Sequence, residues 1–96
     1  MMKNDAVLIN TSRGQIINQS DLENALKKKI IGGAALDVTD PEPLPATSEL
    51  LKMQNVFISP HLGSATKKTR FAMASLAIKN LIELNAGRKP PNMVNE

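Results

Sequence analysis

The chain has 96 residues, enough for one small domain, and 42% of them are hydrophobic, as is typical of a globular protein. It has two phenylalanines, no tyrosine or tryptophan and no cysteine, so we expect an aliphatic core with neither disulfides nor a thiolate metal site. The net charge of +3 comes from two short basic clusters, residues 27–29 and 67–70, which lack the interleaved aromatic side chains of a nucleic-acid surface.

The first apolar run, AVLIN at residues 6–10, ends at a turn-forming Thr-Ser-Arg-Gly sequence and predicts a buried strand. A capping box follows, in which the Ser20 side chain would accept a hydrogen bond from the backbone of Glu23. Apolar residues then recur at helical spacing. The pattern predicts a short helix from about residue 21 to 28.

The second apolar run, IIGGAALDV at residues 30–38, predicts another buried strand. Residues 39–45 (TDPEPLP) contain three prolines, which exclude a helix or a central strand and predict a stiff loop. A short helical turn is expected around residues 48–53. The third strand is predicted at residues 55–59 (NVFIS).

The C-terminal part predicts a long helix over about residues 66–86, ending near Gly87. Its apolar residues form one stripe and also occupy other faces: Met73, Leu76, Ala77, Leu81 and Leu84 on the stripe, and Phe71, Ala74, Ile78 and Ile82 elsewhere. A helix that is apolar on several sides needs several partners. We therefore expect the isolated chain to self-associate.

Strands joined through helices at these intervals predict an α/β fold with a parallel sheet, arranged as half of a doubly wound domain. Ligands in such sheets bind outside the carboxyl ends of the strands. Arg13 follows the first predicted strand, Asp37 and Glu42 the second, and His61 the third. The four side chains should therefore meet at one edge of the sheet.

This set of side chains suits the reduction of a 2-oxo acid. A guanidinium can bind the carboxylate with paired hydrogen bonds, and a histidine fixed by a carboxylate can give a proton to the carbonyl oxygen. No side chain delivers a hydride, so a nicotinamide cofactor is implied. From the residues alone, another interpretation remains open: Arg13 as a surface residue, Asp37 as a helix cap and Glu42 as a solvated acid of the loop.

Three segments that carry these residues, VLINTSRGQIINQSDLENAL, GAALDVTDPEPLP and NVFISPHLGSAT, resemble consecutive signatures of the D-isomer-specific 2-hydroxyacid dehydrogenases. The resemblance covers nearly the whole chain, and the DVTDPEPLP form is most similar to the branch that reduces glyoxylate and hydroxypyruvate. It implies a Rossmann-like fold and an enzyme that transfers a hydride between NADP or NAD and a small 2-oxo acid.

The resemblance also implies roles for single residues. Arg13 matches the substrate-binding arginine, Glu42 the glutamate that supports the histidine, and His61 the acid/base. Asp37 matches the aspartate that approaches the nicotinamide. The other residues that match cofactor-lining segments of the family are Thr11, Ser12, Gly63 and Ser64, and Arg13 and His61 also belong to this set.

Two family features have no counterpart in the 96 residues: a substrate domain and the glycine-rich G-x-G-x-x-G turn that binds the cofactor pyrophosphate. We therefore expect residues 1–96 to be the C-terminal half of an NAD(P)-binding domain with its C-terminal helix, inactive alone. Lys29 is a smaller departure, because related sequences commonly have glycine there. A lysine with positive φ at this position would be strained.

The remaining expectations concern partners and location. The sequence has no membrane-spanning stretch, and MMKNDAV lacks the layout of a secretory signal, so we expect a cytoplasmic protein that binds neither membranes nor nucleic acid. The family resemblance implies a homodimer and no metal. It also leaves a second function open, a non-catalytic nucleotide-binding scaffold like the corepressors of the same fold.

Overall fold

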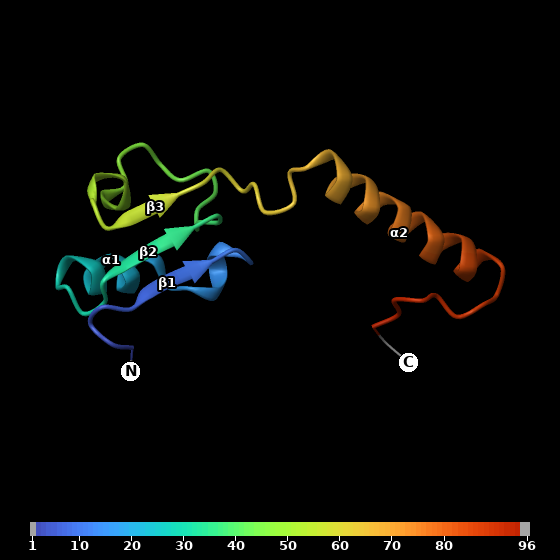
Figure 1. Ribbon diagram of the computed structural model, residues 1–96, viewed down its shortest axis with the longest axis horizontal. Helices are drawn as coiled ribbons and strands as arrows, with labels where there is room; N and C mark the ends of the chain where they lie inside the picture. Colours follow the sequence, from blue (N-terminus) through green and yellow to red (C-terminus); the bar gives the residue numbers. More distant parts are fainter. Residues whose placement is uncertain (1, 95–96) are drawn as a thin grey trace. The chain divides into compact units, whose positions relative to one another are not determined.

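The computed structural model describes residues 2–94, which form two compact units (Figure 1). The first unit ends at Gly63 and contains all the strands; the second begins at Ser64 and contains the long helix. Among the described residues, neither α-helix has the length and hydropathy that would let it cross a membrane.

The first unit is a three-stranded parallel sheet in which the central strand pairs with both of the others. The strands and the segments between them are β1 (Val7–Asn10), η1 (Gly14–Ile16), α1 (Gln19–Lys27), β2 (Gly33–Leu36), η2 (Glu49–Lys52) and β3 (Val56–Ile58). The predicted α/β class and parallel sheet are confirmed. The strands are shorter than the apolar runs that predicted them.

One face of the sheet is covered by α1 and carries the core. The core cluster is aliphatic, as the composition predicts, and consists of Leu22, Leu26, Ile31, Ala34, Leu36 and Leu50. The strand register explains which side chains join them, because Leu8 lies opposite Ala34 and Ile58 opposite Leu36, and both contribute to the core face. Parallel strands place such partners on the same side of the sheet.

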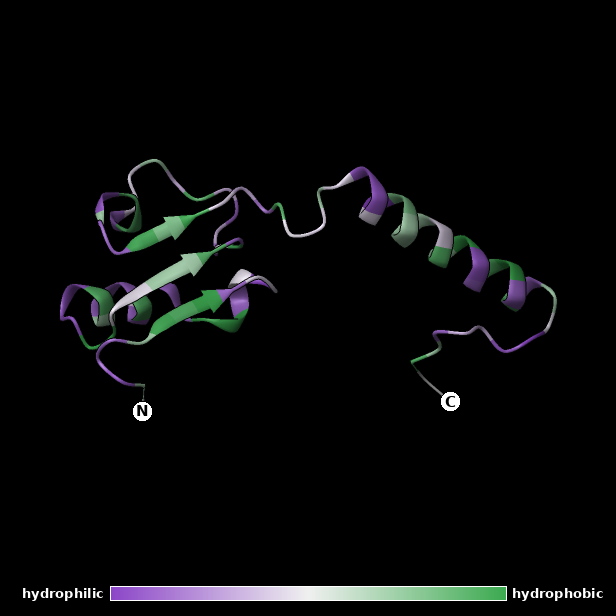
Figure 2. Cartoon of the chain, viewed as in Figure 1, coloured by the Kyte–Doolittle hydropathy of each residue, from purple (hydrophilic) through white to green (hydrophobic). Residues whose placement is uncertain are grey.

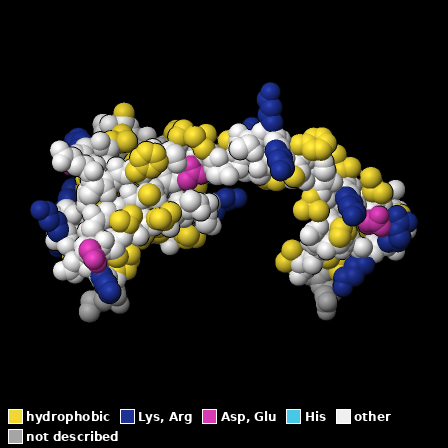
Figure 3. Space-filling model, viewed as in Figure 1, with side chains coloured by type: hydrophobic (Ala, Val, Ile, Leu, Met, Phe, Trp, Pro, Cys, Tyr) yellow, Lys and Arg dark blue, Asp and Glu magenta, His cyan; other side chains and the backbone are white. Residues whose placement is uncertain are grey.

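The opposite face of this sheet is apolar and uncovered within the unit. Val7, Ile9 and Phe57 point away from the core and are 56%, 70% and 68% exposed. Figure 3 shows hydrophobic side chains gathered over the sheet on the face turned toward the viewer. A parallel sheet normally has both faces covered. The apolar face that is exposed in this unit is therefore one that parallel sheets usually bury.

The first α-helix starts two residues earlier than predicted, and the expected cap is wrong. Asn18, not Ser20, is the N-cap: its Oδ1 accepts from the Asp21 N–H at 3.2 Å, while the Ser20 hydroxyl donates to the same oxygen at 2.7 Å. Ile17, directly before the cap, packs against the core that contains Leu22. This apolar pair fixes the chain entry and selects Asn18 as the cap.

Both α-helices end with the same hydrogen-bonding motif but with different residues in the left-handed position. In α1, Lys29 has φ +53°, with Lys29 N–H bonded to Leu26 O at 3.1 Å and Ile30 N–H to Ala25 O at 2.9 Å. These two bonds define a Schellman motif, whose left-handed residue is usually glycine. Lys29 thus takes the positive φ that would strain it, at the position where the family resemblance places a glycine.

The second unit consists mainly of α2 (Lys67–Asn85), in agreement with the predicted long helix. The Thr66 hydroxyl caps its start by accepting from Thr69 N–H at 3.1 Å, and Gly87, with φ +67°, ends it. None of its residues is buried. Hydrophobic (green) and hydrophilic (purple) residues are interspersed along the helix in Figure 2.

We predict that Lys29→Gly stabilises the fold. Glycine accepts φ +53° without the clash between Cβ and backbone, so the free energy of unfolding should rise by about 1 kcal/mol. Lys28→Gly is the matched control, because Lys28 has φ −81° and no strain to relieve. Urea unfolding of both variants and of the unaltered chain, all at the same protein concentration, measures the effect. A midpoint for Lys29→Gly no higher than that of the unaltered chain would contradict the prediction.

Candidate active site

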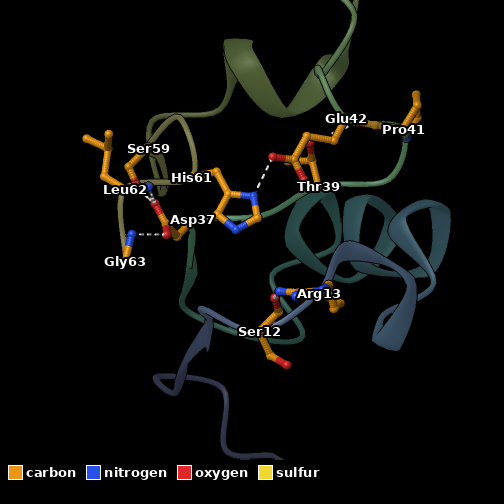
Figure 4. Close-up of polar contacts among 10 residues, drawn as sticks. All are labelled: Ser12, Arg13, Asp37, Thr39, Pro41, Glu42, Ser59, His61, Leu62 and Gly63. Atoms are coloured by element: carbon orange, nitrogen blue, oxygen red, sulfur yellow. Dashed lines mark hydrogen bonds and ion pairs between the residues drawn. The ribbon is translucent and has the colours of Figure 1, made fainter. Parts of the chain in front are cut away.

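The carboxyl ends of the three strands bring the predicted polar residues to one edge of the sheet (Figure 4). Arg13 follows β1, Asp37 comes directly after β2, and His61 lies three residues beyond β3. Glu42 reaches the same edge from the loop that follows β2.

Glu42 and His61 form the central contact of the site. The imidazole Nδ1 lies 2.7 Å from Glu42 Oε1, and their side chains are 44% and 41% exposed for His61 and Glu42, respectively. A carboxylate can only accept a hydrogen bond, so this contact places a proton on Nδ1. The other ring nitrogen, Nε2, is left to act on a bound molecule.

The loop that carries Glu42 is held by two hydrogen bonds, one within the loop and one to the first residue of α1. The Thr39 hydroxyl donates to the Pro41 carbonyl at 2.9 Å, and the Asp40 N–H donates to Gln19 Oε1 at 3.3 Å. Thr39 is buried, whereas most of the proline-containing loop that follows it is exposed. These bonds restrict where Glu42 can lie relative to the imidazole.

Gly14 allows the turn after β1 to pack directly on this loop. A Cβ atom at Gly14 would lie only 2.0 Å from the Thr39 carbonyl oxygen and 2.7 Å from the Asp40 nitrogen, both rigid backbone atoms. No side chain fits there. The glycine after Arg13 therefore brings the first turn and the Glu42 loop into contact.

Asp37 is buried behind the histidine and binds three hydrogen-bond donors. Its Oδ1 accepts from the Ser59 hydroxyl at 2.5 Å and from Leu62 N–H at 2.7 Å, and its Oδ2 accepts from Gly63 N–H at 2.8 Å. It is 8% exposed. A carboxylate has about four acceptor sites, so roughly one remains for another partner.

These donors lower the pKa of Asp37. The Ser59 hydroxyl has the largest effect and the Leu62 N–H follows; burial acts in the opposite direction, and the Gly63 N–H and the nearby His61 add smaller lowering effects. Each donor stabilises the ionised form more than the neutral form. Asp37 is therefore a carboxylate throughout the neutral range.

Arg13 lies at the same edge without contacting the histidine pair. Its guanidinium donates to the Ser12 carbonyl at 2.7 Å, and no hydrogen bond or ion pair joins it to Glu42 or His61 within residues 2–94. Figure 4 shows Arg13 and Ser12 together, apart from that pair. Arg13 is exposed.

The backbone of this first turn is fixed by Asn10, at the end of β1. Asn10 is 3% exposed; its Oδ1 accepts from Ser12 N–H at 3.1 Å, and its Nδ2 donates to the Arg13 carbonyl at 2.9 Å. An asparagine side chain that binds the backbone two residues on is typical of such turns. The turn places Ser12 and Arg13 at the sheet edge.

The other predicted cofactor-lining residues lie on two separate stretches of chain, one after β1 and one after β3. Thr11 and Ser12 are exposed after β1, and Gly63 approaches Asp37 so closely that a Cβ there would lie 3.1 Å from Oδ2. Ser64 is the first residue of the second unit.

Beside the histidine pair is an open pocket of about 520 Å³. Its apolar wall includes Leu44, Leu51 and Ile58, while Glu42 and His61 supply polar groups. A largely apolar pocket with a few polar groups is the usual form of a small-molecule site.

Two residues of the site do not stand out in the sequence. Asn10 was interpreted as the last residue of an apolar strand, although an asparagine before Thr-Ser-Arg-Gly is a signal for a side-chain-bonded turn. Ser59, which binds Asp37, directly precedes Pro60 and has no comparable signal. Only its position at the end of a predicted strand could have drawn attention to it.

A parallel α/β sheet with polar residues at the carboxyl ends of its strands is the arrangement of a nucleotide-binding domain. Residues 1–63 match the family described as D-isomer specific 2-hydroxyacid dehydrogenase, NAD binding domain. The chain belongs to this family.

Individual relatives agree with this assignment. The chain is 47% identical over 95 residues to a glyoxylate reductase from Korarchaeum cryptofilum, covering 99% of this chain and 29% of the relative. It is 50% identical over 91 residues to a glyoxylate reductase/hydroxypyruvate reductase from Mus musculus, covering 95% and 28%. The chain thus spans less than a third of the length of these relatives.

Among solved structures, the chain is similar to a D-isomer specific 2-hydroxyacid dehydrogenase from Xanthobacter autotrophicus, crystallised in complex with NADPH and MES. The TM-score is 0.83 and the sequence identity 36%, over 98% of this chain and 38% of that one. The predicted Rossmann-like fold is confirmed.

We predict that the turn after β3 titrates with Asp37. Because the pKa of Asp37 is lowered in the folded chain, its hydrogen bonds stabilise the turn above the ordinary aspartate value of about 3.9 and are lost as the pH falls through the lowered value. The amide proton shifts of Leu62 and Gly63 should therefore move only in strong acid, with a midpoint below that ordinary value. Asp37→Asn should abolish the movement. A midpoint at or above the ordinary value would contradict the assignment.

Proposed function

We propose that this chain supplies the acid/base half of a reductase that transfers a hydride from NADPH or NADH to a small 2-oxo acid such as glyoxylate or hydroxypyruvate. The contact between His61 Nδ1 and Glu42 at 2.7 Å carries the proposal. It fixes one tautomer of the imidazole and leaves Nε2 to exchange a proton with a substrate oxygen. The names of the relatives, glyoxylate reductase and hydroxypyruvate reductase, support the choice of substrate.

In this proposal His61 gives a proton to the carbonyl oxygen as the carbonyl carbon receives the hydride. Glu42 then stabilises the ring in the orientation needed for proton transfer. Arg13 binds the substrate carboxylate with paired hydrogen bonds. To do so, its guanidinium must leave the Ser12 carbonyl that it contacts at 2.7 Å.

The residues at the sheet edge suit a nicotinamide cofactor. Thr11 and Ser12 offer hydroxyl groups, Asp37 has about one acceptor site left, and Gly63 keeps the backbone close to that carboxylate. These groups can bind the polar amide and ribose of the cofactor; Ser64 belongs to the proposed set by the family resemblance alone. When bound, the dihydronicotinamide supplies the hydride.

We also propose that residues 1–96 are the C-terminal part of a longer enzyme. The relatives are more than three times as long as the matched region, and the sequence contains no glycine-rich pyrophosphate turn. The chain alone should therefore lack much of the cofactor and substrate sites. A cytoplasmic location is also part of the proposal.

His61→Ala in the full-length enzyme should lower kcat by about 10² to 10⁴, because the carbonyl oxygen loses its proton donor. Cofactor affinity, measured by titration of the NAD(P)H fluorescence, should stay nearly unchanged and serves as the internal control. Near-normal glyoxylate reduction by this variant would remove His61 from the mechanism. Absence of glyoxylate reduction by the unaltered full-length protein would instead favour a non-catalytic scaffold of the same fold.

We propose a homodimer for the full protein and predict self-association of the chain alone. Val7, Ile9 and Phe57 expose one apolar sheet face, and Phe71 and Leu81 of α2 are 75% and 65% exposed. Burying such surface is worth about 25 cal/mol per Å², so assembly is favoured. Sedimentation of the chain at micromolar concentration should show oligomers. A separate activity assay should show no glyoxylate-dependent NADPH consumption. A stable folded monomer would contradict the first expectation, and measurable turnover the second.

A further inference from the structure

His61 has an unusual backbone conformation for the residue that carries the chemistry. Its φ is +54°, in the left-handed region that a residue with a Cβ atom adopts only at a cost. Such a conformation persists only where the surrounding structure holds it. The turn from Ser59 to Gly63 must therefore contain what fixes the histidine.

Hydrogen bonds fix this turn on both sides of His61. Before it, Ser59 N–H donates to the Leu36 carbonyl of β2 at 2.9 Å, and His61 N–H donates back to the Ser59 carbonyl at 3.0 Å, closing a tight turn around Pro60. After it, Leu62 N–H and Gly63 N–H donate to the Asp37 carboxylate at 2.7 and 2.8 Å.

The Ser59 hydroxyl joins these two sides. It donates at 2.5 Å to Asp37 Oδ1, the same oxygen that accepts from Leu62 N–H. Through this bond, one carboxylate connects the residue two positions before the histidine with the two residues after it. In Figure 4 these groups lie behind His61, on the side opposite Glu42.

We propose that Ser59, acting through Asp37, is a positioning residue that holds the His61 imidazole against Glu42. This inference rests on the proposed function, in which His61 exchanges the proton. The role needs a hydroxyl that donates to Oδ1, whereas an alanine removes this donor and leaves the turn attached to Asp37 on one side only, through Leu62 and Gly63.

The proposal predicts a larger effect on proton transfer than on cofactor binding. Three of the roughly four acceptor sites of Asp37 serve this turn, so loss of the Ser59 hydroxyl should disturb proton transfer more than cofactor binding. In the full-length enzyme, Ser59→Ala should lower kcat about tenfold, with KM and cofactor affinity changed by less than about twofold. Ser59→Thr retains the hydroxyl and should restore kcat.

A direct test uses the fact that His61 is the only histidine of the 96-residue chain. The ¹⁵N shifts of its ring report which nitrogen carries the proton of the neutral imidazole. In the unaltered chain and in Ser59→Thr, we expect the proton on Nδ1, next to Glu42. In Ser59→Ala it should shift measurably toward Nε2, the position preferred by free imidazole.

Ser20→Ala is the matched control. The Ser20 hydroxyl also donates to a side-chain oxygen, that of Asn18 at 2.7 Å, but Ser20 lies on α1 and not in the turn. It should leave the ring shifts unchanged. Ser59→Cys keeps the size of the side chain with a weaker donor and should give an intermediate shift, which tests the proposal if Ser59→Ala does not fold.

The outcomes separate this proposal from the proposed function. Ring shifts in Ser59→Ala identical to those of the unaltered chain would overturn the positioning role, even if His61→Ala abolishes activity. Full activity of His61→Ala would instead overturn the proposed function, while the ring shifts would still decide whether Ser59 holds the imidazole.

Discussion

β2 lies between β1 and β3 and hydrogen-bonds to both in parallel, with Leu36 opposite Asn10 on one side and opposite Ile58 on the other. This register makes all three strands end at one level, and every polar group of the candidate site follows one of those ends. A slip by one residue would turn Leu36 out of the core and move Asp37 away from the turn that it binds. The apolar packing of one sheet face therefore determines where the chemistry of its edge can occur.

Most of the fold could be predicted because apolar runs closed by turn residues are strong signals. Strand positions and the long helix agreed to within a few residues, whereas the cap of α1 was wrong. Ser20 and Asn18 are both good caps, and the choice depends on Ile17 packing against the core, a contact between segments that local spacing does not reveal. The left-handed Lys29 could be anticipated, because the resemblance placed a glycine there.

The candidate site was predictable in its residues more than in its contacts. Strand ends and the family resemblance indicated that Glu42 and His61 belong together, and they are 2.7 Å apart. The residues alone left Asp37 ambiguous, since nothing in its neighbourhood shows that three donors converge on it. Those donors are two backbone amides and the hydroxyl of Ser59. Backbone amides carry no sequence signal, and a single serine is too common to be informative.

The packing of Gly14 against Thr39 has a consequence for anyone who wishes to redesign the proline loop. A Cβ at Gly14 would meet backbone atoms of Thr39 and Asp40, so trimming a side chain of the loop cannot make room for a larger residue there. Exchanging residues 43–45 would leave the contact between Gly14 and Thr39 intact. An insertion between Thr39 and Glu42 would move the Glu42 carboxylate away from the imidazole. Loop grafting between relatives should therefore begin after Glu42 and retain the four residues that precede the graft.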